Sequence, residues 1–157
     1  MSSGADAVAC EVWFYHLERT PLEQALPELL EKTLARGWRA LVRAPDADRL
    51  GDLDRRLWSY REDSFLPHGR VEDPRPEEQP VLLTTTEDNL NRAQALFIVD
   101  GAPSGPLDGY ERCVTLFDGR DEAALAEARR RWKQYKAEGL SISYWRQNES
   151  GRWEKQA

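Results

Sequence analysis

The sequence has few of the residues that build metal centres and disulfide frameworks. It contains two cysteines and two histidines in 157 residues. Cys10 and Cys113 lie far apart, and neither His16 nor His68 has a cysteine at the spacing of a zinc ligand. We therefore expect reduced thiols that pack as small hydrophobic side chains, and neither a metal nor a cofactor.

Long apolar runs are also missing. No run approaches the roughly 20 residues that cross a bilayer. Residues 1–9 lack the basic and apolar segments of a secretory signal. The expected location is the cytoplasm, with no contact to a membrane.

Glycine-rich phosphate-binding motifs are missing as well. No G-x-G-x-x-G follows a strand-like segment, and no G-x-x-x-x-G-K-[ST] occurs, so no backbone loop is built to approach a pyrophosphate. Asp100 is the best candidate for a catalytic carboxylate, because it ends an apolar segment where α/β enzymes place such groups. It also begins the sequence Asp-Gly-Ala-Pro, and no nucleophile accompanies it, so we interpret Asp100 as a turn residue. The residues favour a protein that is not an enzyme.

The charge of the chain is unevenly distributed. The sequence is 40% hydrophobic and 32% charged with a net charge of −6, as expected for one soluble globular domain. Residues 120–136 hold six basic and three acidic side chains, whereas the rest holds 16 basic and 25 acidic ones. A basic patch on an acidic protein suits an acidic peptide better than a polynucleotide, which the remaining surface would repel.

Strand-like segments alternate with segments of helical periodicity. The expected strands cover residues 11–17, 39–44, 81–84, 95–99 and 112–117, with a C-terminal hairpin at 140–147 and 152–155. The expected helices lie between Thr20 and Gly37, from Asp46 or Asp48 to Trp58, at 87–94 and at 121–138, and residues 66–80 form a long loop. This order predicts an α/β three-layer sandwich with a mostly parallel sheet, Rossmann-like without a nucleotide fingerprint. Residues 1–10 are expected to be a flexible tail, and 11–157 a single domain.

Two helix starts have recognisable capping signals. Thr20-Pro21-Leu22-Glu23 predicts a capping box with proline at the first helical position. In the next helix either aspartate can cap the first turn. Its inner face is expected to carry Leu50, Leu53, Leu57 and Trp58.

The segment 58–68 gathers large apolar side chains among charges and turn residues. Such a cluster on a loop is typical of a docking surface, because its burial against a partner recovers transfer free energy. The alternative is structural: Trp58 would close the preceding helix onto the sheet, and Phe65 would anchor the loop in the core.

The helix at 121–138 has one apolar stripe flanked by cations. The stripe that should face the sheet is Leu125, Ala128, Trp132 and Tyr135. The cations along one flank are Arg129, Lys133 and Lys136, while Arg130 points toward solvent and Arg131 lies on the opposite flank. Donors beside aromatic surface suit an acidic peptide with an apolar end. The alternative is a solvated basic face favoured by the helix dipole.

These segments resemble the chi subunit of bacterial DNA polymerase III holoenzyme over nearly the whole chain. The most similar stretches are FYHL at 14–17, RGWRALV at 36–42, LDRRLWSYREDSFLPHG at 53–69, QPVLLT at 79–84, LFIVDG at 96–101 and ARRRWKQYK at 128–136. W-x(6)-F-x-P-H followed by a late A-R-x-R-[WY]-K helix is fairly specific in combination.

The resemblance implies a non-catalytic accessory subunit of the replicative polymerase clamp loader. One face would bind the small psi subunit, and another would bind the acidic C-terminal tail of the single-stranded-DNA-binding protein. The chain would thereby link the two in DNA replication and repair, with DNA contacted only indirectly. An equivalent of psi, or a repair helicase, would take the psi-type surface where psi is missing.

By similarity, that psi-type docking surface would contain Trp58, Phe65 and Pro67, with Leu66 next to them.

The resemblance also implies a cation set for the acidic tail. Arg129 would be the main cation for the tail carboxylates, supported by Lys133 and the aromatic Trp132. Familiar members have a lysine one turn before this arginine, where Leu125 stands here. The cations that would replace that lysine are Arg130 and Lys136.

Two other functions stay open from the sequence. One is a nucleotide- or nucleic-acid-handling enzyme on the same Rossmann-like fold, with its ligand near Asp100. The other is direct binding of single-stranded DNA through residues 129–136, with bases stacking on Trp132.

Overall fold

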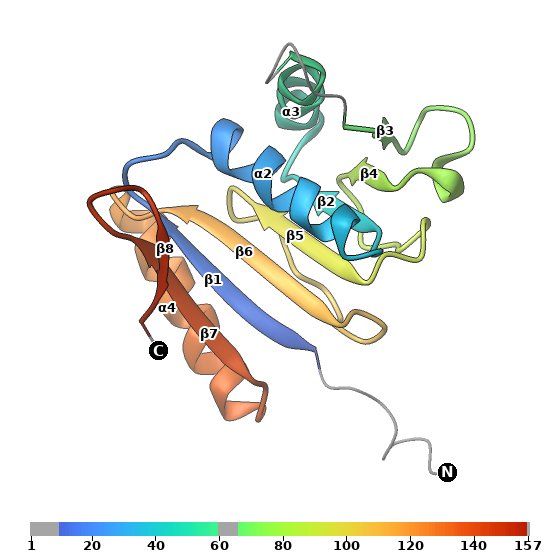
Figure 1. The fold of residues 1–157 in the computed structure, drawn as a ribbon. Helices are drawn as coiled ribbons and strands as arrows, with labels where there is room; N and C mark the ends of the chain where they lie inside the picture. The colour runs from blue at the N-terminus through green and yellow to red at the C-terminus, as the bar shows by residue number, and fades with distance from the viewer. Residues whose placement is uncertain (1–9, 60–65, 157) are drawn as a thin grey trace.

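A computed structural model describes residues 10–59 and 66–156 of the chain. Its eight strands form one sheet in the order β3-β4-β2-β5-β6-β1-β7-β8 (Figure 1). The strands are β1 (Glu11–Leu17), β2 (Ala40–Arg43), β3 (Gly69–Arg70), β4 (Val81–Thr84), β5 (Ala95–Val99), β6 (Arg112–Asp118), β7 (Ile142–Gln147) and β8 (Trp153–Lys155). Every pairing is parallel except the antiparallel hairpin of β7 and β8, which confirms the predicted mostly parallel sheet and C-terminal hairpin.

Helices cover both faces of the sheet. On one face lie α2 (Leu22–Ala35) and α3 (Ala47–Ser59), and on the other lies α4 (Glu122–Ala137) (Figure 1). A single-turn 3₁₀ helix, η1 (Pro76–Glu78), precedes β4. The architecture is therefore the predicted three-layer α/β sandwich.

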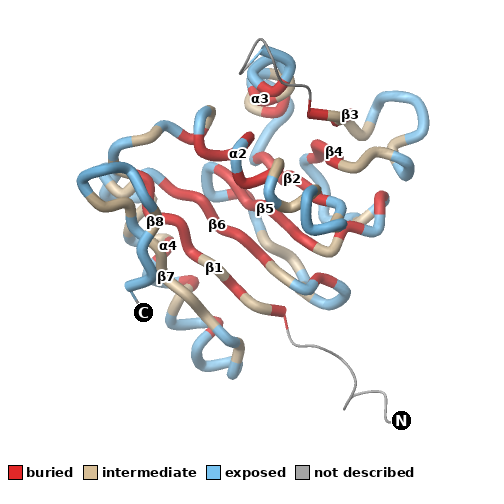
Figure 2. Tube along the Cα trace, in the orientation of Figure 1, coloured by how far each residue is buried: buried red, intermediate tan, exposed pale blue. Residues whose placement is uncertain are grey.

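The core has two parts, one on each face of the sheet. Strands β2, β4 and β5 are buried at every position (Figure 2), including the polar Arg43 and Thr84 at the ends of β2 and β4. Their other residues are apolar, as expected in a sheet covered on both faces. In β1 the faces alternate: Tyr15 belongs to the cluster under α2 and α3, and Phe14 to the cluster under α4. This alternation decides which side chains can meet on each side of the sheet.

The start of α2 differs from the predicted capping box. Pro21 is the N-cap, and no side chain caps the helix. The Thr20 hydroxyl instead accepts a hydrogen bond of 2.8 Å from Gln147 Nε2, so a contact with a distant strand replaces the local cap. In α3 the predicted cap is present, because Asp46 Oδ1 accepts from the Arg49 N–H at 2.8 Å.

Trp58 does not lie on the inner face of α3, and that prediction was wrong. Leu50, Leu53 and Leu57 form the buried stripe, whereas Trp58 is 56% exposed. Successive residues of a helix are rotated by about 100°, so the residue after Leu57 points away from the sheet.

Two predicted connections were also wrong. Residues 87–94 form no helix, because the Asn89 side chain binds the backbone N–H and carbonyl of Ala93 and the Asn91 amide binds the carbonyls of Ala40 and Gln79. Such side-chain bonds compete with helical ones. The expected loop at 66–80 contains β3 and η1.

Both cysteines are buried and free, as expected. Burial raises the pKa of the Cys10 thiol to about 12 and also raises that of Cys113. Within residues 10–59 and 66–156, no three or more His, Cys, Asp or Glu side chains gather into a group that could hold a metal ion. In the same ranges no helix combines the length and apolar character needed to cross a membrane.

Candidate functional site

A groove of about 560 Å³ lies beside α4, at the carboxyl ends of β1 and β6. Its walls come from three parts of the chain that are distant in sequence: the end of β1, α4, and β7. The lining residues are His16, Glu18, Gly119, Leu125, Ala128, Arg129, Trp132, Lys133, Tyr144 and Arg146. Three of the five residues predicted for an acidic tail, Arg129, Trp132 and Lys133, therefore meet in one groove.

Aromatic rings form the apolar part of the groove. The ring centre of Trp132 lies 5.8 Å from that of Tyr144 in an edge-to-face arrangement and 5.7 Å from that of buried Phe14. Parallel pairing of β1 with β7 places Phe14 opposite Tyr144. The half-buried Trp132 and Tyr144 thus present a preorganised surface for an apolar side chain.

His16 fixes the end of the groove. Its Nδ1 lies 2.5 Å from the Tyr144 hydroxyl and its Nε2 lies 2.9 Å from Glu18 Oε1. Burial, together with nearby Arg146, lowers the pKa of His16. A neutral ring with its proton on Nε2 fits both contacts, because Nε2–H donates to Glu18 and Nδ1 accepts from Tyr144.

Glycine is required beneath this ring. A Cβ atom on Gly119 would overlap the imidazole of His16. The Gly119 N–H donates to the Leu17 carbonyl at 2.7 Å, so the backbone cannot move away from β1 without losing that bond.

The groove carries cations that the described part of the chain leaves without ion-pair partners. Arg129 and Lys133 are exposed and make no ion pair with a described carboxylate, whereas Arg146 pairs with Glu18 across the groove. Arg129 and Lys133 stand at positions i and i+4, where like charges destabilise a helix by a few tenths of a kcal/mol. Arg129 also lies two turns before the end of α4, and the helix dipole favours cations only in the last turn. Stabilisation of the helix itself therefore does not explain why a cation stands at Arg129.

The other two predicted tail residues lie elsewhere on α4. Arg130 points away from the groove and binds both carboxylate oxygens of Glu127, at 2.9 and 2.7 Å. Lys136 is exposed and does not line the groove. Arg131, expected on the opposite flank, is buried there: it pairs with Glu127 and donates to the carbonyls of Gly101 and Ala102.

The residues predicted to bind a psi-type partner differ in how far their side chains are buried. Trp58 is exposed and Pro67 is half-buried. Leu66 is only 2% exposed and belongs to the core under α3, which corrects its place on the docking surface. Phe65 lies outside the described residues. His68 Nδ1 donates to the Leu66 carbonyl at 2.8 Å, so this histidine holds the loop end in place.

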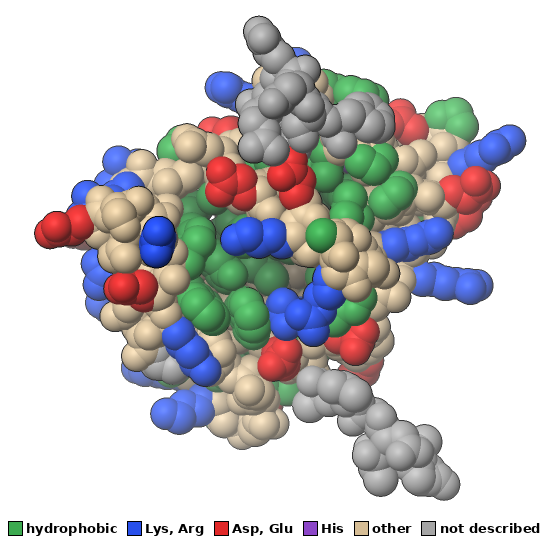
Figure 3. All heavy atoms as spheres, in the orientation of Figure 1, with side chains coloured by type: hydrophobic (Ala, Val, Ile, Leu, Met, Phe, Trp, Pro, Cys, Tyr) green, Lys and Arg blue, Asp and Glu red, His purple; other side chains and the backbone are tan. Residues whose placement is uncertain are grey.

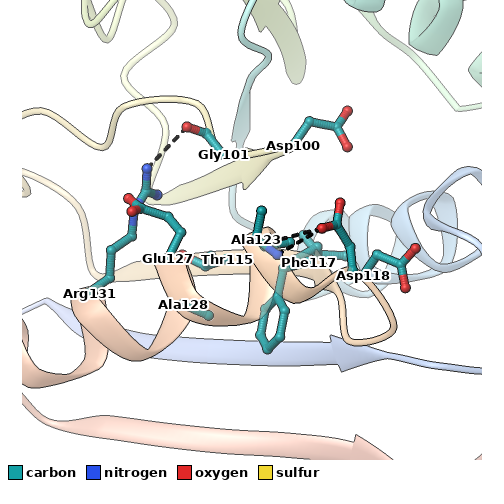
Figure 4. Close-up of a pocket in the computed structure, with 12 residues that line it drawn as sticks. Asp100, Gly101, Thr115, Phe117, Asp118, Ala123, Glu127, Ala128 and Arg131 are labelled. Atoms are coloured by element: carbon teal, nitrogen blue, oxygen red, sulfur yellow. Dashed lines mark hydrogen bonds and ion pairs between the residues drawn. The ribbon is translucent and has the colours of Figure 1, made fainter.

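A second pocket, of about 340 Å³, lies at the carboxyl ends of β5 and β6, where nucleotide-binding folds hold phosphates. Figure 4 shows carboxylates around it. Those carboxylates are Asp100, Asp118, Asp121 and Glu127. Asp121 accepts from the N–H groups of Ala123 and Ala124, so a carboxylate already occupies the α4 N-terminus that a phosphate would need. Phosphate would be repelled here.

Asp100 is a turn residue, as the sequence predicts. Asp100 and Gly101 have φ values of 52° and 75°, and the Ala102 N–H closes the turn on the Val99 carbonyl at 3.1 Å. The Asp100 carboxylate is paired with Arg49.

Sequence reasoning missed the wall of the groove that β7 supplies. Tyr144 and Arg146 lie two residues apart, and the period of a strand puts both on the face of the sheet that carries α4. The alternation of residues 142–147 could have indicated a common face. Only the pairing of β7 with β1 shows that this face lies beside α4.

Comparisons with known proteins agree with the resemblance. The profile of a family described as "DNA polymerase III chi subunit, HolC" matches residues 10–143. A protein of Rickettsia prowazekii (strain Madrid E) named "Probable DNA polymerase III subunit chi" is 26% identical over 66% of this chain, and the match spans 62% of that relative's length. A Pseudomonas aeruginosa protein named "DNA polymerase III subunit chi" is 28% identical over 76% of this chain and 82% of its own. The chain belongs to the DNA polymerase III chi subunit family.

Proposed function

We propose that the chain is a non-catalytic accessory subunit of the replicative polymerase in the cytoplasm. In this proposal it connects the clamp loader to the single-stranded-DNA-binding protein by binding that protein's acidic C-terminal tail in the groove beside α4. The observation that carries the proposal is the placement of Arg129 and Lys133, which form no ion pair with a described carboxylate, next to the half-buried rings of Trp132 and Tyr144.

The chemistry of the groove supports this ligand class. An acidic tail that ends in an apolar residue needs donors for its carboxylates and a dry surface for its last side chain. The guanidinium of Arg129 can bind a carboxylate with two parallel hydrogen bonds. The aromatic surface contributes transfer free energy without conformational loss, because contacts with Phe14 and His16 already hold the rings.

A psi-type partner, or a repair helicase, is proposed at the exposed Trp58 and the half-buried Pro67. This surface lies at the end of α3, on the sheet face that carries α2 and α3, whereas the groove lies on the face that carries α4. The two partners would therefore bind without competing, as an adaptor requires.

Isothermal titration calorimetry with a synthetic acidic peptide ending in proline-phenylalanine tests the groove. Arg129→Ala should weaken binding by about 1.5–3 kcal/mol, the range for losing a charge-assisted contact. Arg130→Ala is the matched control, because it removes the same side chain from the next position, which faces away from the groove. Equal losses in the two variants, or no loss in Arg129→Ala, would contradict the assignment.

A further inference from the structure

The sheet face that carries α2 and α3 is only partly covered by them. Figure 1 shows these helices on the side of β2, β4, β5 and β6, while β7 and β8 carry no described helix on this face. A hollow of about 230 Å³ opens between α2 and the strands. In Figure 3 hydrophobic side chains form its floor, and Lys and Arg side chains stand around it. This hollow has no role in the function proposed above.

The floor continues into a row of stacked aromatic rings. Trp13 and Trp145 stack with ring centres 5.1 Å apart, and Tyr15 meets Trp153 edge-on at 4.7 Å. The three tryptophans are partly exposed at the margin of the core. Contiguous apolar surface of this kind marks an interaction site more often than a solvated surface.

Cations are interleaved with these rings. The Arg112 guanidinium lies 3.8 Å from the ring centre of Trp13 and 5.1 Å from that of Trp38, and the Arg36 guanidinium lies 4.3 Å from the ring centre of Trp38. Lys32 completes the rim. Glu11 meets part of the Arg112 charge, because its Oε1 lies 3.4 Å from Nη2, while the Arg112 Nε is buried and has no hydrogen-bond acceptor among the described groups.

We propose that this hollow is a second protein-binding site, which takes an extended acidic segment that inserts one apolar side chain. Its volume suits a single side chain, and Lys32 and Arg36 would bind flanking carboxylates. A carboxylate of the same segment would also be attracted by the charge of Arg112, which lines the hollow. Helix-dipole preference accounts for cations at the end of α2 but not for Arg112, which stands on a strand.

Single-stranded nucleic acid fits the hollow less well. Bases bind by stacking on open ring faces, whereas Arg112 and Trp145 already lie against Trp13 and Arg36 lies against Trp38. The rim has three cations, one of which, Arg112, pairs with Glu11 at 3.4 Å. A backbone carrying a phosphate at each nucleotide needs a longer basic track.

The hollow and the groove beside α4 are independent sites. Trp13 and Phe14 are neighbours in β1 and face opposite sides of the sheet, one into each site. Occupation of either site therefore leaves the other open, and this inference does not depend on the proposed function.

The experiment uses the full chain carrying Arg129→Ala, so that the groove does not contribute. The probe is a fluorescein-labelled peptide with blocked ends, in which aspartates flank one phenylalanine, and binding is followed by anisotropy. Saturable binding is expected, and adding Lys32→Glu with Arg36→Glu should weaken it at least about tenfold. Both substitutions are on exposed positions, so the fold should tolerate them, and an unchanged urea midpoint checks this. Arg56→Glu on the exposed α3 surface, alone and together with Arg55→Glu to equal the charge change, is the control.

Two further peptides define the ligand. Replacing the aspartates by lysines should abolish binding, and replacing the phenylalanine by glycine should weaken it. The proposal is overturned if the aspartate peptide does not saturate, if the charge-reversed rim binds it equally well, or if Arg56→Glu has the same effect. Tighter binding of an oligothymidylate that depends on Lys32 and Arg36 would also overturn it, in favour of a nucleic-acid site.

Discussion

At the scale of single residues, the groove depends on close approaches that tolerate no extra atom. His16 rests directly over Gly119 and is held by Tyr144 on one side and Glu18 on the other. The ring also touches the edge of Phe117, with centres 5.2 Å apart. One glycine therefore sets the position of a side chain that orients the groove's aromatic wall.

Gly119→Ala should destabilise the protein by about 1–3 kcal/mol, the usual cost of overpacking. Its added methyl group must displace His16, and the contact between His16 and Tyr144 should weaken with it. Equilibrium unfolding in urea measures the free energy of unfolding.

Gly51→Ala is the control for that substitution. Gly51 lies within α3, where an added Cβ meets only the Arg55 Nη1 at an ordinary 3.7 Å. Alanine there should stabilise the helix by about 0.5–1 kcal/mol. Destabilisation of the same size by both substitutions would argue against a special contact at Gly119.

At the scale of elements, the position of the groove cations depends on how α4 is attached to the sheet. It packs on the sheet through Ala128 and Tyr135, and Arg131 ties it to the loop after β5 by donating to Gly101 and Ala102. Glu127 holds Arg131 in that position at 2.9 Å. This fixed attachment keeps Arg129, on the other side of the helix, at a constant position over the groove.

The attachment of α4 predicts a dependence of stability on pH. Hydrogen bonds from Arg130 and Arg131 lower the pKa of Glu127 from 4.5 to about 2. A carboxylate with a lowered pKa contributes stability above its ordinary pKa and loses it as the pH falls through the folded value. Between pH 4.5 and 2 the urea midpoint of the wild-type protein should therefore fall more steeply than that of Glu127→Gln.

The control for this pH series is Glu149→Gln, a loop position that is exposed. The urea midpoint of this variant should change with pH as that of the wild-type protein does. If Glu127→Gln falls as steeply as the wild type, the ion pairs of Glu127 do not stabilise α4 in solution.

At the scale of the whole molecule, an acidic protein presents two small cationic sites on opposite faces of its sheet. The net charge of −6 discourages contact with polyanions, while the local cations still attract short acidic segments. This combination suits the proposed role of connecting protein partners.

The affinity for the acidic peptide should fall as salt rises, since the cations of the groove are exposed and screened by ions. Raising the salt from about 0.05 M to about 0.5 M should weaken binding of the wild-type protein roughly tenfold. Arg129→Ala should show a shallower slope in the same calorimetric titrations. An affinity that does not change with salt would indicate a site that binds through apolar contacts only.

The amino-acid sequence by itself determined the class of the fold and most of its elements. Short apolar runs such as 81–84 and 95–99 are typical of interior strands, and the apolar stripe of α4 is expected to face the sheet. The stretches that resemble chi subunits also indicated the family, which the comparisons confirmed. These features are local, so periodicity and short motifs reveal them.

Only the tertiary structure decided which distant side chains meet. Thr20 binds Gln147 instead of capping its own helix, Leu66 is in the core, and Arg129 shares a groove with Arg146, which sequence reasoning did not select. The physical reason is that strand order and register are set by long-range pairing, which leaves no periodic signal in the sequence. A helix pattern shows where Arg129 points, but the parallel pairing of β7 with β1 decides what lies opposite it.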